Sequence, residues 1–161
     1  MEWSGIVAPG AAAPPAYNPG MSDARARLLG GRSPAAFLAR FWQKEALRIP
    51  AALPGFRGPF DFPALRRLAL RDDVESRLVV REGARWTLKH GPLVAADFRA
   101  LPPRQWTLLV QGANLHDGAC DALLRHFAFI PHARLDDVMV SYAAPGGGVG
   151  PHVDDYDVFL L

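Results

Sequence analysis

The sequence predicts an α+β fold in which helices come first and strands gather toward the end of the chain. Two segments with helical spacing of apolar residues lie early, and segments rich in β-branched and aromatic residues follow them. Strands and helices do not alternate strictly, as they would in a doubly wound parallel sheet. The 161 residues suffice for one compact domain and little more.

Residues 1–23 are expected to form a disordered tail. Up to Gly20 the sequence is rich in Ala, Pro and Gly, and Glu2 is its only charge. A segment of this composition cannot bury enough apolar surface to offset the entropy lost on ordering. We therefore expect the ordered domain to cover residues 24–161.

Three helices are predicted from their caps and spacing. Residues 33–47 begin with Ser33 as N-cap, followed by a proline at the first helical position. Residues 61–70 form a shorter helix with Asp61 as its cap. Residues 116–131 contain a third helix, which must end before the proline that closes the segment.

Five strands are predicted among the β-branched and aromatic runs. The first two form a hairpin that turns around Gly83, where a residue without a Cβ turns the chain most easily. The expected strands cover residues 76–80, 85–88, 105–112, 136–144 and 152–161.

Composition excludes several classes of function. A net charge of +2 is too weak to indicate a nucleic-acid binder. The basic cluster of Arg66, Arg67 and Arg71 is interpreted as a solvated helix face. The single cysteine, Cys120, cannot form an internal disulfide and is interpreted as a packing residue. No apolar run is long enough to span a bilayer and no signal peptide is evident, so a soluble cytoplasmic protein is expected.

A His-Val-Asp step in the last segment is the strongest candidate for chemistry. In an extended strand His152 and Asp154 point to the same side, because side chains alternate with period two. An imidazole nitrogen beside a carboxylate suits Fe(II), Mn(II) or Zn(II). The pattern supplies two corners of the facial triad of two histidines and one carboxylate that holds Fe(II) and leaves the other face open.

The surroundings of this step favour a site over a plain strand. The preceding PGGGVGP, residues 145–151, has four glycines among seven residues, which permits tight turns and close approach of a ligand. Asp155 and Asp157 would point to the opposite face, as solvated or turn-capping carboxylates or as partners that orient a ligand. Tyr156 would share the face of His152, and we expect it to pack under the sheet rather than line a pocket.

The segment ARLDDVMVSYAAPGGGVGPHVDDYDVFLL, residues 133–161, resembles the metal-binding core of the bacterial JmjC-type ribosomal oxygenases. Looser similarity to this cupin-like family extends through SPAAFLARFWQKEAL, VESRLV, HGPL and WTLLVQGAN. The resemblance covers roughly residues 24–161, which is nearly all of the ordered chain.

The resemblance implies a double-stranded β-helix, the jelly roll of cupins. It implies that His152 and Asp154 are the first two iron ligands. The third ligand of the family, a later histidine, and the basic residue that binds the distal carboxylate of 2-oxoglutarate would both lie beyond Leu161. None of the histidines upstream of the glycine-rich segment matches a ligand position of the family.

The activity that the resemblance implies is hydroxylation of an arginine in a large-subunit ribosomal protein, with Fe(II) and 2-oxoglutarate as cofactors. The expected partner is that ribosomal protein, without direct contact to nucleic acid or membrane. A homodimer is a further option for the full-length protein. Two alternatives stay open: a related JmjC or cupin oxygenase with another substrate, and a non-catalytic truncated remnant.

The final residues lead us to expect a fragment. The sequence ends DVFLL, inside a predicted apolar strand, whereas chain ends are usually polar or small. We therefore expect residues 24–161 to be the N-terminal part of an oxygenase domain, cut within the core sheet.

Overall fold

The computed structural model describes residues 27–161, so the tail expected over residues 1–23 lies outside the described part. Four helices lie in this part: α2 (Pro34–Arg40), α3 (Phe62–Ala69), α4 (Ala95–Arg99) and α5 (Gly118–Arg125). The four strands are β1 (Ser76–Glu82), β2 (Arg85–His90), β3 (Trp106–Val110) and β4 (Val140–Ala143). Two short 3₁₀ turns, η1 (Ala113–Leu115) and η2 (His132–Arg134), flank α5.

The strands form one antiparallel sheet in the order β2-β1-β3-β4. The register places Leu78 of β1 opposite Leu108 of β3, which in turn faces Tyr142 of β4. The hairpin turns at Gly83 with a φ of +62°, as predicted. The α+β class is confirmed.

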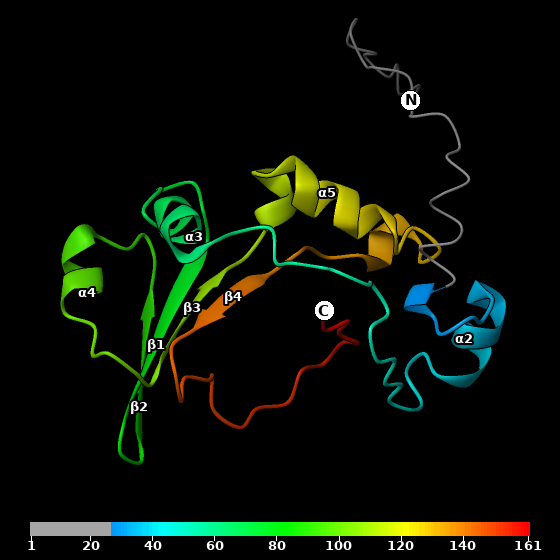
Figure 1. The fold of residues 1–161 in the computed structure, drawn as a ribbon, viewed down its shortest axis with the longest axis horizontal. Coiled ribbons are helices and arrows are strands. Elements are labelled where there is room, and N and C mark those ends of the chain that lie inside the picture. The colour runs from blue at the N-terminus through cyan, green and yellow to red at the C-terminus, as the bar shows by residue number, and fades with distance from the viewer. Residues whose placement is uncertain (1–26) are drawn as a thin grey trace, which may run out of the picture.

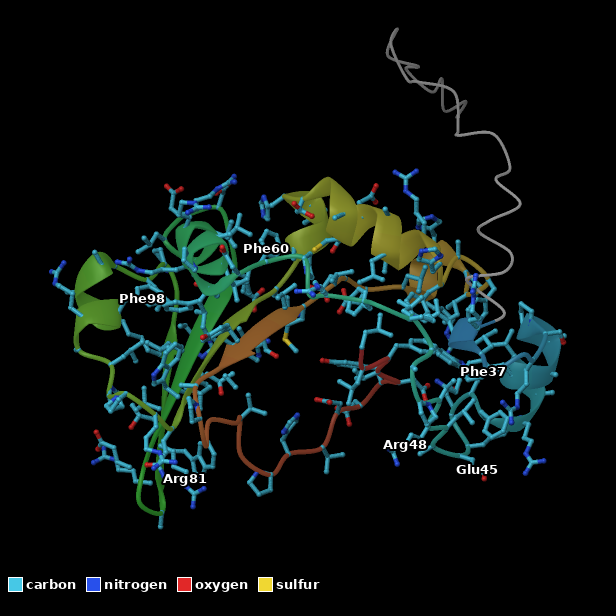
Figure 2. The ribbon with its side chains drawn as sticks, viewed as in Figure 1. Phe37, Glu45, Arg48, Phe60, Arg81 and Phe98 are labelled. Carbon is cyan, nitrogen blue, oxygen red and sulfur yellow. The ribbon has the colours of Figure 1, made fainter. Side chains whose placement is uncertain are left out.

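Two apolar clusters hold the elements together. One lies between α3 and the sheet, with Leu65, Leu108 and Val110 almost fully buried and Phe60 and Phe98 packed against its rim. The second surrounds Phe37 of α2. Figure 2 shows Phe98 toward the end of the molecule opposite Phe37, with Phe60 between them, and Figure 1 shows α5 running between the two ends.

The predicted N-caps are confirmed. The Ser33 hydroxyl accepts a hydrogen bond from the Ala36 amide at 3.1 Å. The Asp61 carboxylate accepts one from the Ala64 amide at 2.8 Å.

Replacing Asp61 with alanine is expected to lower the free energy of unfolding by about 1 kcal/mol, because α3 then starts with an unsatisfied amide. Urea denaturation followed by circular dichroism measures this change. Asp72→Ala, an exposed carboxylate that caps no helix, serves as the control. Equal stability of the two variants would show that the cap contributes nothing.

The helix expected over residues 33–47 is shorter than predicted. It ends at Arg40, and Gln43 takes a φ of +56°. The Gln43 amide donates to the Asp157 carboxylate at 3.2 Å instead of to a helical carbonyl. The distant Asp157 therefore satisfies an amide in the turn that follows the helix.

The strand predicted over residues 152–161 is wrong. These residues form no ladder with any described strand, and a strand exists only where its backbone groups are paired with a neighbour. They follow β4 and return toward α2, as the red end of the ribbon in Figure 1 shows. Tyr156 is 63 % exposed, so its expected packing under the sheet is also wrong.

Candidate metal centre

A glycine-rich loop over residues 144–150 carries the chain from β4 to the His-Val-Asp step. The Gly147 amide donates to the Ala144 carbonyl at 2.7 Å, and the Gln105 amide donates to the Pro145 carbonyl at 2.9 Å. Gly147 has no room for a side chain, because a Cβ there would overlap the carbonyl oxygen of Trp106 and lie 2.9 Å from that of Ala144. The loop therefore lies directly against the start of β3.

His152 and Asp154 come together although they are not in a strand. The Nε2 atom of His152 lies 3.6 Å from Oδ1 of Asp154. The two side chains are 53 % and 38 % exposed. The period-two argument that paired them was therefore incorrect, yet the pairing itself is present.

The backbone fixes which nitrogen of His152 is free to bind a metal. Nδ1 lies 3.0 Å from the carbonyl oxygen of Gly150. A carbonyl can only accept, so Nδ1 carries the proton of this hydrogen bond. In the neutral ring Nε2 is then unprotonated, and its lone pair faces Asp154.

This arrangement fits a divalent metal ion. The Nε2 lone pair and the Asp154 carboxylate are both acceptors, so a cation between them would satisfy both. Metal–ligand distances of about 2.0–2.2 Å place two ligands of one metal roughly 3.0–3.6 Å apart. The observed separation lies at the upper end of this interval.

A third ligand is not found in the described residues. No group of three or more His, Cys, Asp or Glu that could hold a metal occurs within residues 27–161. His90 and His126 line separate surface hollows. The pair thus offers two of the three ligands that the predicted facial triad needs.

The segment that carries the pair is held to α2 beyond the site. The ring of Phe159 lies 4.4 Å from that of Phe127, 5.9 Å from that of Phe37 and 6.1 Å from that of Trp42 between centroids. Asp157 caps the Gln43 amide in a turn, which is one of the roles expected for this carboxylate. Both contacts join residues more than 30 positions apart, so no local sequence signal could have revealed them.

Cys120 is a packing residue, as predicted. It is fully buried in α5, and burial together with the nearby Asp117 carboxylate raises the pKa of its thiol to about 11. The thiolate, which is the reactive form, is therefore scarce at neutral pH.

We expect Cys120 to react with a disulfide reagent at pH 8 at least about tenfold more slowly in the folded chain than in urea. Absorbance of the released thiolate follows the reaction. Equal rates in both solvents would show that the thiol is accessible and that α5 is open.

The described part of the chain contains no helix long and apolar enough to cross a membrane.

Comparison with known proteins finds similarity that extends over the His152–Asp154 pair. The JmjC domain family matches residues 122–161, which include His152 and Asp154. Over 125 residues the chain is 41 % identical to the ribosomal protein uL16 3-hydroxylase of Escherichia coli K12, covering 78 % of this chain and 33 % of that protein. The resemblance to JmjC-type ribosomal oxygenases is confirmed.

A second JmjC-type relative is equally similar. The probable ribosomal oxygenase of Haemophilus influenzae is 41 % identical over 130 residues, which are 80 % of this chain and 32 % of the relative. The chain thus spans about a third of the length of the curated oxygenases it matches.

The fold agrees with solved ribosomal oxygenases. The structure of YcfD from Escherichia coli matches with a TM-score of 0.71 and 38 % identity, over 78 % of this chain and 34 % of YcfD. The structure of YcfD in complex with cobalt and 2-oxoglutarate matches with a TM-score of 0.70 and 39 % identity, over 76 % and 33 %.

Proposed function

We propose that the complete protein is an Fe(II)- and 2-oxoglutarate-dependent dioxygenase that hydroxylates an arginine of a large-subunit ribosomal protein. The single observation that carries the proposal is the His152–Asp154 pair, whose free Nε2 and carboxylate face each other at 3.6 Å. The relatives named as ribosomal oxygenases, one of them solved with cobalt and 2-oxoglutarate, support the choice of chemistry. Co(II) and Fe(II) both accept imidazole and carboxylate ligands.

His152 would bind the iron through Nε2 as a neutral imidazole. Asp154 would contribute a negative charge that offsets part of the charge of the ion. The carbonyl of Gly150 holds the ring in the required tautomer, as second-sphere partners of metal-binding histidines do. The iron, with 2-oxoglutarate, would supply the oxygen chemistry that side chains cannot.

The remaining parts of the site are proposed to lie beyond Leu161. They are a third ligand, a histidine, and a basic residue for the distal carboxylate of 2-oxoglutarate. An arginine suits the latter role because its guanidinium binds a carboxylate through two parallel hydrogen bonds. We further propose that the protein acts in the cytoplasm, where ribosomal proteins are available.

The test uses the complete gene product that contains this sequence, with Fe(II), 2-oxoglutarate and large-subunit ribosomal proteins. We expect one ribosomal protein to gain the mass of one oxygen atom on an arginine, and His152→Ala to abolish the gain. Succinate formation without modification of a ribosomal protein would point to an oxygenase with another substrate. Absence of both reactions would favour a non-catalytic remnant.

A further inference from the structure

The indole of Trp86 lies against the glycine-rich loop that precedes His152. A Cβ placed on Gly150 would lie 3.6 Å from both Cδ2 and Cε2 of Trp86, and one on Gly148 would lie 3.7 Å from Cη2. The ring therefore lies beside the loop at two glycines, on the side that a side chain would occupy. One of these glycines, Gly150, provides the carbonyl that accepts from Nδ1 of His152.

Trp86 is itself held in place by the hairpin. It pairs with Arg81 across β1 and β2, and the Arg81 guanidinium carbon lies 5.4 Å from the centre of the indole ring. Arg81 also donates from Nε to the Gly83 carbonyl at 2.9 Å. Figure 2 labels Arg81 toward the turn end of the hairpin. A cation over an aromatic ring is attracted by the ring quadrupole, so the indole has a preferred orientation.

The loop needs an external support. Gly146 and Gly150 take φ values of +72° and +79°, which glycine adopts at little cost. The same freedom gives a glycine-rich loop many other conformations when nothing restrains it. Gly147 fixes the loop against β3. At Gly150 the three atoms nearest to an added Cβ, apart from those of the adjoining residues, all belong to the Trp86 ring.

We propose that Trp86 is a positioning residue for the metal pair. Its ring holds the loop so that the Gly150 carbonyl stays within hydrogen-bonding distance of Nδ1 of His152, which leaves Nε2 free toward Asp154. The role of Trp86 toward a metal rests on the proposed function. The effect of Trp86 on the His152 tautomer does not require a metal.

Three variants separate this role from general effects on the sheet. Trp86→Val removes the ring but keeps a residue with high strand preference. Trp86→Phe keeps a smaller ring. Leu88→Ala is the control, because Leu88 is 54 % exposed on the same strand and is not among the atoms nearest these glycines. A dispersed amide spectrum verifies that each variant is folded.

The first readout is the ring ¹⁵N spectrum of His152 in the metal-free chain at pH 8.5, where a free imidazole is neutral. Wild type and L88A are expected to show mainly the tautomer protonated on Nδ1, and W86V a mixture of both tautomers. An unchanged tautomer in W86V would overturn the proposal. This result is independent of whether the pair binds metal.

The second readout is the affinity for Mn(II), measured by electron paramagnetic resonance of the free ion. We expect the affinity for Mn(II) to fall about tenfold in W86V and about threefold in W86F, and to stay unchanged in L88A. Removing an outer-sphere partner of a metal ligand typically lowers the metal affinity tenfold or more. Wild-type affinity in both Trp86 variants would overturn the proposal. If W86V does not fold, unchanged affinity and tautomer in W86F would overturn it.

The two failures are distinguishable. No Mn(II) binding by the wild type, or equal binding by His152→Ala, would remove the proposed metal pair and the role of Trp86 toward a metal with it. Binding through His152 that is indifferent to Trp86 would remove only the inference about Trp86.

Discussion

Gly147→Ala is expected to weaken Mn(II) binding about tenfold and to lower the free energy of unfolding by about 2 kcal/mol. The added Cβ would overlap the Trp106 carbonyl and approach the Thr107 hydroxyl to 3.0 Å. Both neighbours belong to the central strand β3, so the loop must move instead. That movement carries Gly150 away from His152.

Gly58→Ala is the matched control, because nothing lies within 4 Å of a Cβ at that position. Isothermal titration with Mn(II) gives the affinity, and urea denaturation gives the stability. If G147A and G58A behave alike in both measurements, the loop does not lie against β3 as described.

Phe159→Ala is expected to lower the free energy of unfolding by about 2–3 kcal/mol, less than the loss of a fully buried phenylalanine, because Phe159 is only partly buried. Its ring joins α2 and the segment after α5 to the residues that follow the metal pair. Without the ring, residues 155–161 keep the Asp157–Gln43 hydrogen bond to the turn that follows α2.

Leu160→Ala tests whether the effect is specific, because the neighbouring Leu160 is 91 % exposed. We expect this variant to stay within about 0.5 kcal/mol of the wild type. Urea denaturation of both variants provides the comparison. A loss of similar size in L160A, or none in F159A, would contradict the packing of this segment on α2.

The parts of the fold that could be predicted depend on local chemistry. Ser33 and Asp61 marked two helix starts, because a side chain that caps an amide acts within three residues. The turn at Gly83 was also identifiable, since glycine adopts a positive φ at less cost than residues with a Cβ. The helix α4 was missed because it has only five residues and no buried face.

The parts that could not be predicted depend on distant residues. The turn that follows α2 carries a hydrogen bond from Gln43 to Asp157, 114 positions away. Residues 152–161 alternate like a strand, but a strand also needs a paired neighbour, which a pattern of side chains cannot supply.

In the candidate site, too, some features were predictable from the sequence and others were not. The His-Val-Asp step after a glycine-rich loop was visible in the sequence and remains a prediction as a metal site. The role of Gly150 as hydrogen-bond acceptor and the support from Trp86 were not visible, because both arise from the folding of the loop onto the hairpin. These contacts concern the orientation of the ligands rather than their identity.

The central claim is that His152 and Asp154 hold one metal ion together. Adding Mn(II) to the ¹⁵N-labelled chain tests it directly, because the paramagnetic ion broadens the amide signals nearest to it. We predict that the signals of residues 150–156 broaden first. The substitution Asp154→Ala should remove this broadening, whereas Asp155→Ala, at the neighbouring position, should preserve it. Broadening that survives in Asp154→Ala would contradict the account. So would broadening that centres on the surface hollow lined by Asp72, Asp73 and Glu75.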